Sequence, residues 1–245
     1  MRILLLGGTG EASLLAHALK NAGFDAVFSY AGRTDDPAPQ PLPMRIGGFG
    51  GVEGLIAYLG AEQITHVIDA THPFAAKMSW NAHAACAARG LPLLALERAA
   101  WRPLKIDAWT EVADNAAALA ALPDRPARVF LAIGKQGLDD FKTAVQHHFL
   151  LRLVDAPAEK PLPNCTLVIA KGPFTIEGDT ALMQKHKITH VIAKNAGGKG
   201  ASAKLAAARA LGLPVIMIAR PNLPERHRVE SVDAVLDWLD HFAPT

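Results

Sequence analysis

The chain has 245 residues, of which 50% are hydrophobic, 20% charged and 6% aromatic. This composition excludes a disordered tail, and the length suits one or two domains of about 150 residues each. The 25 Lys and Arg residues against 23 Asp and Glu residues leave a formal charge of +2. That charge is too small for a general nucleic-acid or membrane-surface protein.

The N-terminus and the two cysteines indicate a cytoplasmic protein. The apolar run that opens the chain stops at Gly7 and Gly8, which is too short for a signal peptide. No segment approaches the roughly 20 apolar residues of a membrane span. Cys86 and Cys165 are too few and too far apart for a disulfide framework or a thiolate metal site. We therefore expect no metal, no nucleic-acid partner and no membrane partner.

Apolar runs of strand length alternate with alanine-rich helical stretches along the chain. Because the runs are continuous, they predict parallel strands that are buried on both faces. The predicted strands cover residues 3–6, 26–28, 66–68, 93–96, 129–133, 167–170, 190–193 and 215–219. The clearest predicted helices cover residues 11–22, 74–89 and 202–211. His147 and His148 are expected at a helix end on the surface.

An internal repeat organises the sequence. The pentapeptide ITHVI occupies residues 64–68 and returns unchanged at residues 188–192. The tripeptide GLP, followed by an apolar strand and an arginine, occurs at residues 90–92 and again at residues 212–214, in nearly the same register. The opening strand at residues 2–7 has a weaker echo at residues 128–134. Three echoes in nearly one register indicate two structural units of similar topology.

The fold class predicted from this repeat is α/β, with two Rossmann-like parallel-sheet domains of similar topology and a cleft between them. The N-terminal domain is expected at residues 1–98, with a glycine-rich nucleotide loop, and the C-terminal domain at residues 99–245. Open α/β sheets bind their ligands beyond the carboxyl ends of the strands. We therefore expect the functional residues in the loops that follow strands.

The loop after the first predicted strand reads GGTG and precedes a helix. Glycines let backbone N–H groups approach a pyrophosphate, and a helix N-terminus adds partial positive charge. Gly8 and Gly10 match the dinucleotide fingerprint, but Ser13 stands in the place of the third glycine. Glu11 also brings a carboxylate to the phosphate position. The loop indicates nucleotide binding, with a tight turn that binds no ligand as the alternative.

The second predicted strand ends without an acidic residue. An NAD-specific site places Asp or Glu there to bind the ribose hydroxyls. This chain instead offers the hydroxyl of Ser29 and the guanidinium of Arg33, which suit a 2′-phosphate. The pattern predicts NADP(H) rather than NAD(H), and it also argues against an S-adenosylmethionine site. The alternative for Arg33 is an ordinary solvated loop residue.

The loop after the strand at residues 66–68 combines an acid, a hydroxyl and an imidazole. Asp69, Thr71 and His72 lie at a strand end, and Pro73 follows at a helix start, where its missing N–H costs little. A carboxylate near a histidine suggests proton handling. The alternative is structural, with Thr71 capping the helix and His72 packed against it.

The corresponding loop of the second half is rich in lysine and glycine. It contains Lys194, Asn195, Gly197, Gly198, Lys199, Ser202 and Lys204 before a helix. Accessible backbone N–H groups and ammonium groups make an anion site. The spacing is not that of a P-loop, which needs a Lys-Ser or Lys-Thr pair. A mobile surface loop is the alternative.

Five strings of the sequence together resemble the precorrin-6A reductases of cobalamin biosynthesis. They are GGTGE at residues 7–11, AGR at 31–33, DATHPFA at 69–75, ER at 97–98 with Trp101, and KNAGG at 194–198. The resemblance spans nearly the whole chain, and the DATHPFA string is its specific part. It implies an NADPH-dependent oxidoreductase acting on a CH–CH group. The expected reaction is reduction of one carbon–carbon double bond of the precorrin-6A macrocycle to give precorrin-6B.

The resemblance also assigns expected roles. NADPH is held by Gly8, Thr9, Gly10, Ser29, Arg33 and Thr71. His72 and Asp69 are the catalytic candidates, with His72 the leading proton donor, although a water or a substrate carboxyl is an alternative. Carboxylates of the substrate are bound by Lys194, Asn195, Gly197, Gly198, Lys199 and Ser202.

The expected partners are a tetrapyrrole substrate and, transiently, neighbouring enzymes of the pathway. Three other functions stay open at this point. The first is a cobalt-precorrin-6A reductase, which has a metallated substrate that no residue here distinguishes. The second is a non-enzymatic NADP-binding module. The third is an S-adenosylmethionine-dependent methyltransferase, which the end of the second strand disfavours.

Overall fold

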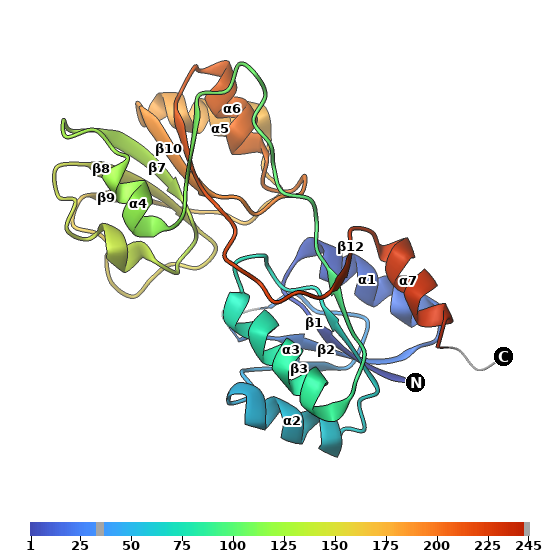
Figure 1. Cartoon of the computed structure of the whole chain (residues 1–245). Helices are drawn as coiled ribbons and strands as arrows, with labels where there is room; N and C mark the ends of the chain where they lie inside the picture. The colour runs from blue at the N-terminus through green and yellow to red at the C-terminus, as the bar shows by residue number, and fades with distance from the viewer. Residues whose placement is uncertain (33–36, 243–245) are drawn as a thin grey trace. The chain divides into compact units, whose positions relative to one another are not determined.

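The computed structural model describes residues 1–32 and 37–242 and divides the chain into two compact units. Unit 1 consists of Met1–Ala99 and the segment that begins at Pro221, and unit 2 consists of Ala100–Arg220 (Figure 1). Each unit contains a six-stranded sheet in which every strand pairing is parallel. The predicted α/β class with two Rossmann-like sheets is confirmed, and the predicted cleft stays a prediction.

Unit 1 has six strands and four helices among the described residues. In chain order they are β1 (Arg2–Leu6), α1 (Gly10–Asn21), β2 (Asp25–Tyr30), β3 (Met44–Ile46), α2 (Gly51–Ala61), β4 (His66–Asp69), α3 (Ala76–Arg89), β5 (Leu93–Leu96), β12 (His227–Val229) and α7 (Val232–Asp240). The strand order in the sheet is β12-β5-β4-β1-β2-β3. The carboxyl ends of β1 and β4, which precede the predicted site loops, therefore lie side by side.

The core of unit 1 explains why its strands are continuous apolar runs. Ile3 and Leu5 of β1 pack in one cluster with α1 and α7, whereas Leu4 and Leu6 pack in another with α2 and α3. Successive side chains of a strand point to opposite faces of the sheet, so helices on both faces require apolar residues at every position. The two helix pairs can be followed in Figure 1.

Unit 2 repeats this plan. Its described elements are β6 (Trp109–Val112), α4 (Asn115–Ala120), β7 (Arg128–Ala132), the 3-10 helix η1 (Leu138–Phe141), β8 (His148–Leu153), β9 (Cys165–Ile169), α5 (Ile176–Lys185), β10 (His190–Lys194), α6 (Ala203–Ala210) and β11 (Val215–Ile218). The strand order is β6-β11-β10-β7-β8-β9. Phe130 of β7 packs with α5 and α6, and on the other face Phe149 contacts Phe141 of η1. Both faces of this sheet are therefore covered as well.

The repeated pentapeptide leads into equivalent strands, β4 and β10, which pair with β1 and β7 respectively. The Thr65 hydroxyl accepts a hydrogen bond from the N–H of Arg2 at 2.9 Å, and the Thr189 hydroxyl accepts one from the N–H of Arg128 at 3.1 Å. The repeat in the sequence is thus a repeat of local hydrogen bonding. The strand orders of the two sheets also correspond position by position, which confirms the predicted similarity of topology.

The end of the chain corrects the expected second domain. Residues from Pro221 onward belong to unit 1, where β12 pairs with β5 and α7 packs with α1. Residues 99–245 therefore do not form one unit. The chain returns to unit 1 at its end and adds β12 as an edge strand of that sheet. The sequence did not predict this, because a strand of three residues has too little pattern to show which sheet it joins.

The strand β8 corrects a second expectation. His148 begins this strand and His147 is 2% exposed, so the pair does not lie at a helix end on the surface. Arg152 interrupts the apolar run of β8 and hides its strand character. In the structure the guanidinium of Arg152 is ion-paired with Asp179 and stacks 3.5 Å from the ring centroid of Phe174, so the charge is accommodated inside the fold.

Candidate functional site

The glycine-rich turn after β1 needs glycine for two separate reasons. A Cβ at Gly7 would lie 2.1 Å from the ring of Phe28, so this position must be glycine for packing. Gly8 has a φ of +123°, which a residue with a side chain adopts only under strain. A Cβ at Gly8 or at Gly10 would meet no atom within 4 Å, so the backbone of both residues faces open space. The turn therefore presents bare backbone at the start of α1.

Thr9 is the N-cap of α1, and its side chain is fully used there. Its hydroxyl accepts a hydrogen bond from the N–H of Ala12 at 3.1 Å and donates one to the carbonyl of Ala70 at 2.9 Å. These two bonds start the helix and tie the turn after β1 to the loop after β4. The one donor of the hydroxyl is therefore in use, so in this arrangement a hydrogen bond from Thr9 to a phosphate comes from its backbone N–H.

An arginine of the neighbouring strand β3, which the sequence did not reveal, contacts the end of β2. Ser29 is 5% exposed, and its hydroxyl accepts a hydrogen bond from Arg45 at 2.9 Å. Arg45 also donates to the carbonyls of Gly47 and Gly48 at 2.8 and 3.0 Å and lies 3.8 Å from the ring centroid of Phe49. Arg45 was missed because the three-residue strand β3 was not predicted. Arg33 lies outside the described residues.

Asp69 lies at the end of β4 and is 2% exposed, and both of its carboxylate oxygens accept hydrogen bonds. One carboxylate oxygen accepts from the N–H and the hydroxyl of Thr71 at 3.1 and 2.7 Å, and the other accepts from the hydroxyl of Ser79 at 2.7 Å. The second oxygen also lies 3.1 Å from a guanidinium nitrogen of Arg226, which in turn contacts Glu97 at 3.2 Å. Asp69 therefore holds the loop in shape.

His72 is half-buried, and its ring has a defined orientation. Its Nδ1 accepts a hydrogen bond from the N–H of Phe74 at 3.2 Å. An imidazole nitrogen that accepts a hydrogen bond carries no proton, so the proton of neutral His72 resides on Nε2. Helix α3 begins after Ala75 without a side-chain cap, and the hydroxyl of Thr71 is bonded to Asp69. Thr71 therefore does not cap this helix.

A pocket of about 650 Å³ lies at this edge of the sheet in unit 1. Its lining comes from the ends of β1, β2 and β4, from the connection between β3 and α2, and from α3. The lining residues are Gly7, Gly8, Tyr30, Ala31, Gly32, Gly48, Phe49, Gly50, Gly51, Thr71, His72, Ala75, Lys77, Met78 and Asn81. The volume is in the range of small-molecule sites. The pocket thus brings together Gly8, Thr71 and His72, whereas Ser29 and Asp69 are buried in its supporting structure.

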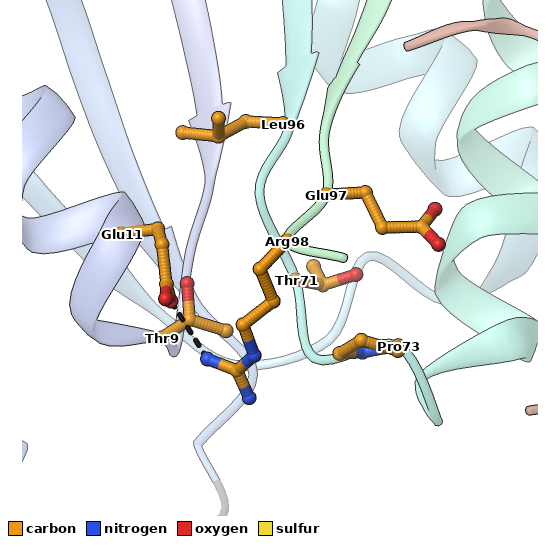
Figure 2. A pocket seen from close by; sticks show the side chains of 7 residues that line it. All are labelled: Thr9, Glu11, Thr71, Pro73, Leu96, Glu97 and Arg98. Carbon is orange, nitrogen blue, oxygen red and sulfur yellow. Dashed lines mark hydrogen bonds and ion pairs between the residues drawn. The ribbon is translucent and has the colours of Figure 1, made fainter. Parts of the chain in front are cut away.

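A second, smaller pocket adjoins the same turn. Thr9, Glu11, Thr71, Pro73, Leu96, Glu97 and Arg98 line it (Figure 2). Thr71 borders both pockets, and Glu11 forms an ion pair with Arg98 at 2.7 Å.

The lysine-rich loop of unit 2 is built around Trp101. The side-chain amide of Asn195 accepts from the N–H of Trp101 at 2.8 Å and donates to its carbonyl at 3.0 Å. The indole N–H of Trp101 donates to the carbonyl of Gly198 at 2.7 Å. The ammonium of Lys204, which is 5% exposed as a residue, lies 4.7 Å from the Trp101 ring centroid. Asn195 and Lys204 therefore shape the loop.

The remaining predicted residues of this loop have different surroundings. Lys199 is exposed, and Lys194 is half-buried and donates to the carbonyl of Gln136 at 3.3 Å. Gly197 and Gly198 have φ values of +70° and +75°, which allow the sharp turn. The hydroxyl of Ser202 donates to the carbonyl of Lys199 at 2.9 Å. The positive charge that this loop presents to solvent therefore comes mainly from Lys199.

Two kinds of feature are missing from the part of the chain that the structure covers. No helix among these residues combines the length and apolar character needed to cross a bilayer. Over the same residues, no three side chains of His, Cys, Asp or Glu gather as a metal-binding group.

The fold and the site together identify the structural class of the protein. A parallel sheet with helices on both faces, a glycine-rich turn into the first helix and a pocket at the carboxyl ends of the strands are the features of Rossmann-like α/β proteins.

Comparison with known proteins gives the particular family. The family model of precorrin-6x reductase CbiJ/CobK matches residues 2–240. The chain is 63% identical over 244 residues to the precorrin-6A reductase of Rhodobacter capsulatus, covering 99% of this chain and 97% of that protein. It is 30% identical to the cobalt-precorrin-6A reductase of Priestia megaterium, covering 90% and 91%. A solved structure described as CobK precorrin-6A reductase aligns with a TM-score of 0.96 at 61% identity, covering 100% of this chain and 98% of that chain.

The chain therefore belongs to the precorrin-6x reductase family and is an oxidoreductase. The resemblance that its motifs indicated is confirmed.

Proposed function

We propose that this protein reduces one carbon–carbon double bond of precorrin-6A to give precorrin-6B, with NADPH as the reductant. The observation that carries the proposal is the glycine-lined pocket at the end of β1, in a chain that is 63% identical to a precorrin-6A reductase over nearly its full length. The family membership supports the substrate class, and the pocket supports the cofactor. When bound, NADPH supplies the hydride.

The residues present fit a dinucleotide. Gly8 and Gly10 leave their backbone uncovered, and the capped N-terminus of α1 directs its N–H groups and partial positive charge toward the turn. In the proposed arrangement these groups bind the phosphates, Thr9 contributes its backbone, and Thr71 borders the nicotinamide end of the pocket. The substitution Gly10→Ala is expected to weaken NADP⁺ binding about tenfold, because the methyl group would enter the space that now meets no protein atom.

The preference for NADPH is proposed to rest on the end of β2. Arg33, as predicted from the sequence, and Arg45, which contacts Ser29, are the candidate ligands of the 2′-phosphate. Ser29 supports this site by holding Arg45. We expect Arg33→Ala to raise the KM for NADPH much more than the KM for NADH, and equal effects on the two would remove Arg33 from this role.

His72 is the proposed proton donor. Its Nδ1 accepts the bond from Phe74, which places a proton on Nε2, and the residue borders the pocket. Asp69 supports this role as a positioning residue because its carboxylate is occupied by Thr71, Ser79 and Arg226. Reduction of the double bond needs one hydride and one proton. His72 would act in its imidazolium form, which replaces the neutral form that accepts the Phe74 bond. It would give its Nε2 proton to the carbon next to the one that receives the hydride and return to the neutral imidazole.

The lysine-rich loop of unit 2 is proposed to bind carboxylates of the macrocycle. Lys199 and Lys194 supply ammonium groups, and Gly197, Gly198 and Ser202 supply the turn that carries them. Asn195 acts through Trp101 by holding the loop. The site of action is proposed to be the cytoplasm, where transient contacts with neighbouring pathway enzymes would pass the substrate on.

The test is an anaerobic incubation of the purified protein with NADPH and precorrin-6A, followed by nicotinamide absorbance and by the mass of the product. We expect NADPH oxidation together with a mass gain of two hydrogen atoms. Binding of NADPH without oxidation would instead support a non-enzymatic NADP-binding module. A parallel incubation with the cobalt-containing substrate distinguishes the two reductase activities, and the higher identity to precorrin-6A reductases favours the cobalt-free one.

A further inference from the structure

The first turn of α1 contains a residue that opposes the proposed cofactor site. Glu11 directly follows Gly10, at the helix end where the phosphates of a dinucleotide are proposed to bind. In the absence of a ligand, its negative charge stabilises the positive N-terminal end of α1. When a pyrophosphate is bound there, the same charge repels it. A dinucleotide site at this turn therefore needs a device that neutralises Glu11.

The structure provides a guanidinium at this position. Arg98 follows β5, two strands away from β1 in the sheet, and its guanidinium lies 2.7 Å from the carboxylate of Glu11. The side chains are 18% exposed for Arg98 and 29% for Glu11, so the pair is largely shielded from solvent. A partly buried pair interacts more strongly than an exposed one, because less water screens the charges.

The direction of the side chains shows that Arg98 is aimed at Glu11. Figure 2 shows Glu97 and Arg98 leaving the chain on opposite sides, with Arg98 extending toward Glu11 and Thr9. Glu97 instead contacts Arg226 at 3.2 Å, in the cluster that also holds Asp69. Adjacent residues after β5 therefore serve two different ion pairs, and the one with Arg98 lies beside the N-cap of α1.

We propose that Arg98 is a positioning residue for the cofactor, and that it acts by neutralising the charge of Glu11 beside the glycine-rich turn. The proposal rests on the proposed binding of NADP(H) at that turn. Without Arg98, the carboxylate of Glu11 is unpaired beside the phosphates. With Arg98, the N-terminal turn of α1 keeps its attraction for an anion.

A set of four proteins tests this proposal through the dissociation constant of NADP⁺, measured by isothermal titration calorimetry. Relative to the unmodified protein, Arg98→Gln is expected to weaken NADP⁺ binding roughly tenfold, because an unpaired carboxylate then repels the phosphates. Glu11→Gln is expected to bind NADP⁺ at least as well as the unmodified protein. The double variant Glu11→Gln/Arg98→Gln is expected to recover most of the affinity that Arg98→Gln loses.

The double variant separates the two ways in which Arg98 can act. If Arg98 bound the phosphates directly, the double variant would bind NADP⁺ as weakly as Arg98→Gln, and the action through Glu11 would be rejected. Arg98→Lys keeps the positive charge and is expected to recover part of the affinity. Thermal unfolding of each variant without ligand checks that the fold is retained.

The matched control is Arg2→Gln, which breaks an ion pair of similar length at the other end of β1. Arg2 lies 2.8 Å from Glu62, and the change in net charge equals that of Arg98→Gln. It is expected to leave the dissociation constant of NADP⁺ unchanged, and an equal loss in both variants would show a general charge effect and overturn the proposal. An unmodified protein that does not bind NADP⁺ would instead refute the proposed function. Unchanged affinity in Arg98→Gln, when the unmodified protein binds, would refute only the role of Arg98.

Discussion

The loops after β4 and after β10 begin from the same pentapeptide and have opposite chemistry. The first loop carries the buried carboxylate of Asp69 and the imidazole of His72, whereas the second carries Lys194 and Lys199. The two backbones start alike because Thr65, just before β4, and Thr189, just before β10, accept the same hydrogen bond from the neighbouring strand. The shared strands thus support the loops without determining their chemistry.

Each loop is held by a residue that lies close in the sequence to a point where the chain passes from one unit to the other. Arg226 follows the return to unit 1 at Pro221 and is ion-paired with Asp69. Trp101 follows the entry into unit 2 at Ala100 and is bonded to Asn195. A buried ion pair holds the first loop and neutral hydrogen bonds hold the second, so we expect the first to be more sensitive to loss of its partner.

The largest expected effect is on the ion pair of the first loop. Arg226→Met removes the guanidinium that is ion-paired with the buried Asp69, and the side chains of Arg226 and Asp69 are only 7% and 1% exposed. Loss of one partner of a buried pair costs about 3–5 kcal/mol. Urea denaturation should show this decrease in the free energy of unfolding, and Arg2→Met, which breaks a more exposed pair, should show about 1 kcal/mol or less. Equal losses would contradict the difference between the two sites.

The second prediction concerns the chemistry that only the first loop carries. His72→Gln is expected to lower the rate of reduction about 100-fold, which is typical for loss of a general acid, while the dissociation constant of NADP⁺ stays nearly unchanged. Single-turnover oxidation of NADPH in the presence of substrate measures the rate. A variant with a near-normal rate would show that water or a substrate carboxyl supplies the proton.

The third prediction concerns the second loop. Asn195→Ala removes both bonds to Trp101, whose N–H and carbonyl are part-buried, and losing these bonds costs about 1–3 kcal/mol. We also expect a higher KM for the substrate, because the loop that carries Lys199 loses its anchor. Lys199→Gln is the matched variant: the side chain is exposed, so we expect an altered KM with unchanged stability. An Asn195→Ala protein with normal stability would refute the anchoring role.

The smallest expected effect is common to both repeats. Burial lowers the pKa of His66 and of His190, since it disfavours the charged imidazolium. The unfolded chain therefore takes up protons at a higher pH than the folded chain does. The stability that these residues contribute is complete above the ordinary pKa of about 6.5 and is lost as the pH falls through the lowered values. Urea denaturation should show that the free energy of unfolding decreases between about pH 8 and pH 5. In His66→Gln and in His190→Gln this decrease should be smaller.

The pattern of apolar residues made most of the fold predictable. Strands covered on both faces, such as β1 and β4, are continuous apolar runs, and the repeat revealed that the two sheets are alike. Short edge strands and β8 were missed. A three-residue strand has too few positions to show a pattern, and Arg152 in β8 has a charge whose partner, Asp179, is visible only in the folded protein.

The candidate site was predictable in its location more than in its details. The glycine-rich turn and the loop that contains His72 have local signatures, and both line the pocket of unit 1. Arg45 and Arg226 have no such signature, and Arg98 was noted only in the ER string of the family resemblance, without a role. Their partners are distant in the sequence, so only the fold shows that these arginines contact Ser29, Glu11 and Asp69.

The sequence by itself therefore determined the α/β class, the doubled topology, the family and the turns where ligands are expected, because these depend on local patterns of apolar residues, glycines and short motifs. Tertiary structure alone decided that the last segment joins unit 1, that Asp69 is a buried support, and that Asn195 anchors its loop to Trp101. Those properties depend on pairs of residues that are far apart in the chain. Such pairs form only when the folded chain brings the two residues into contact.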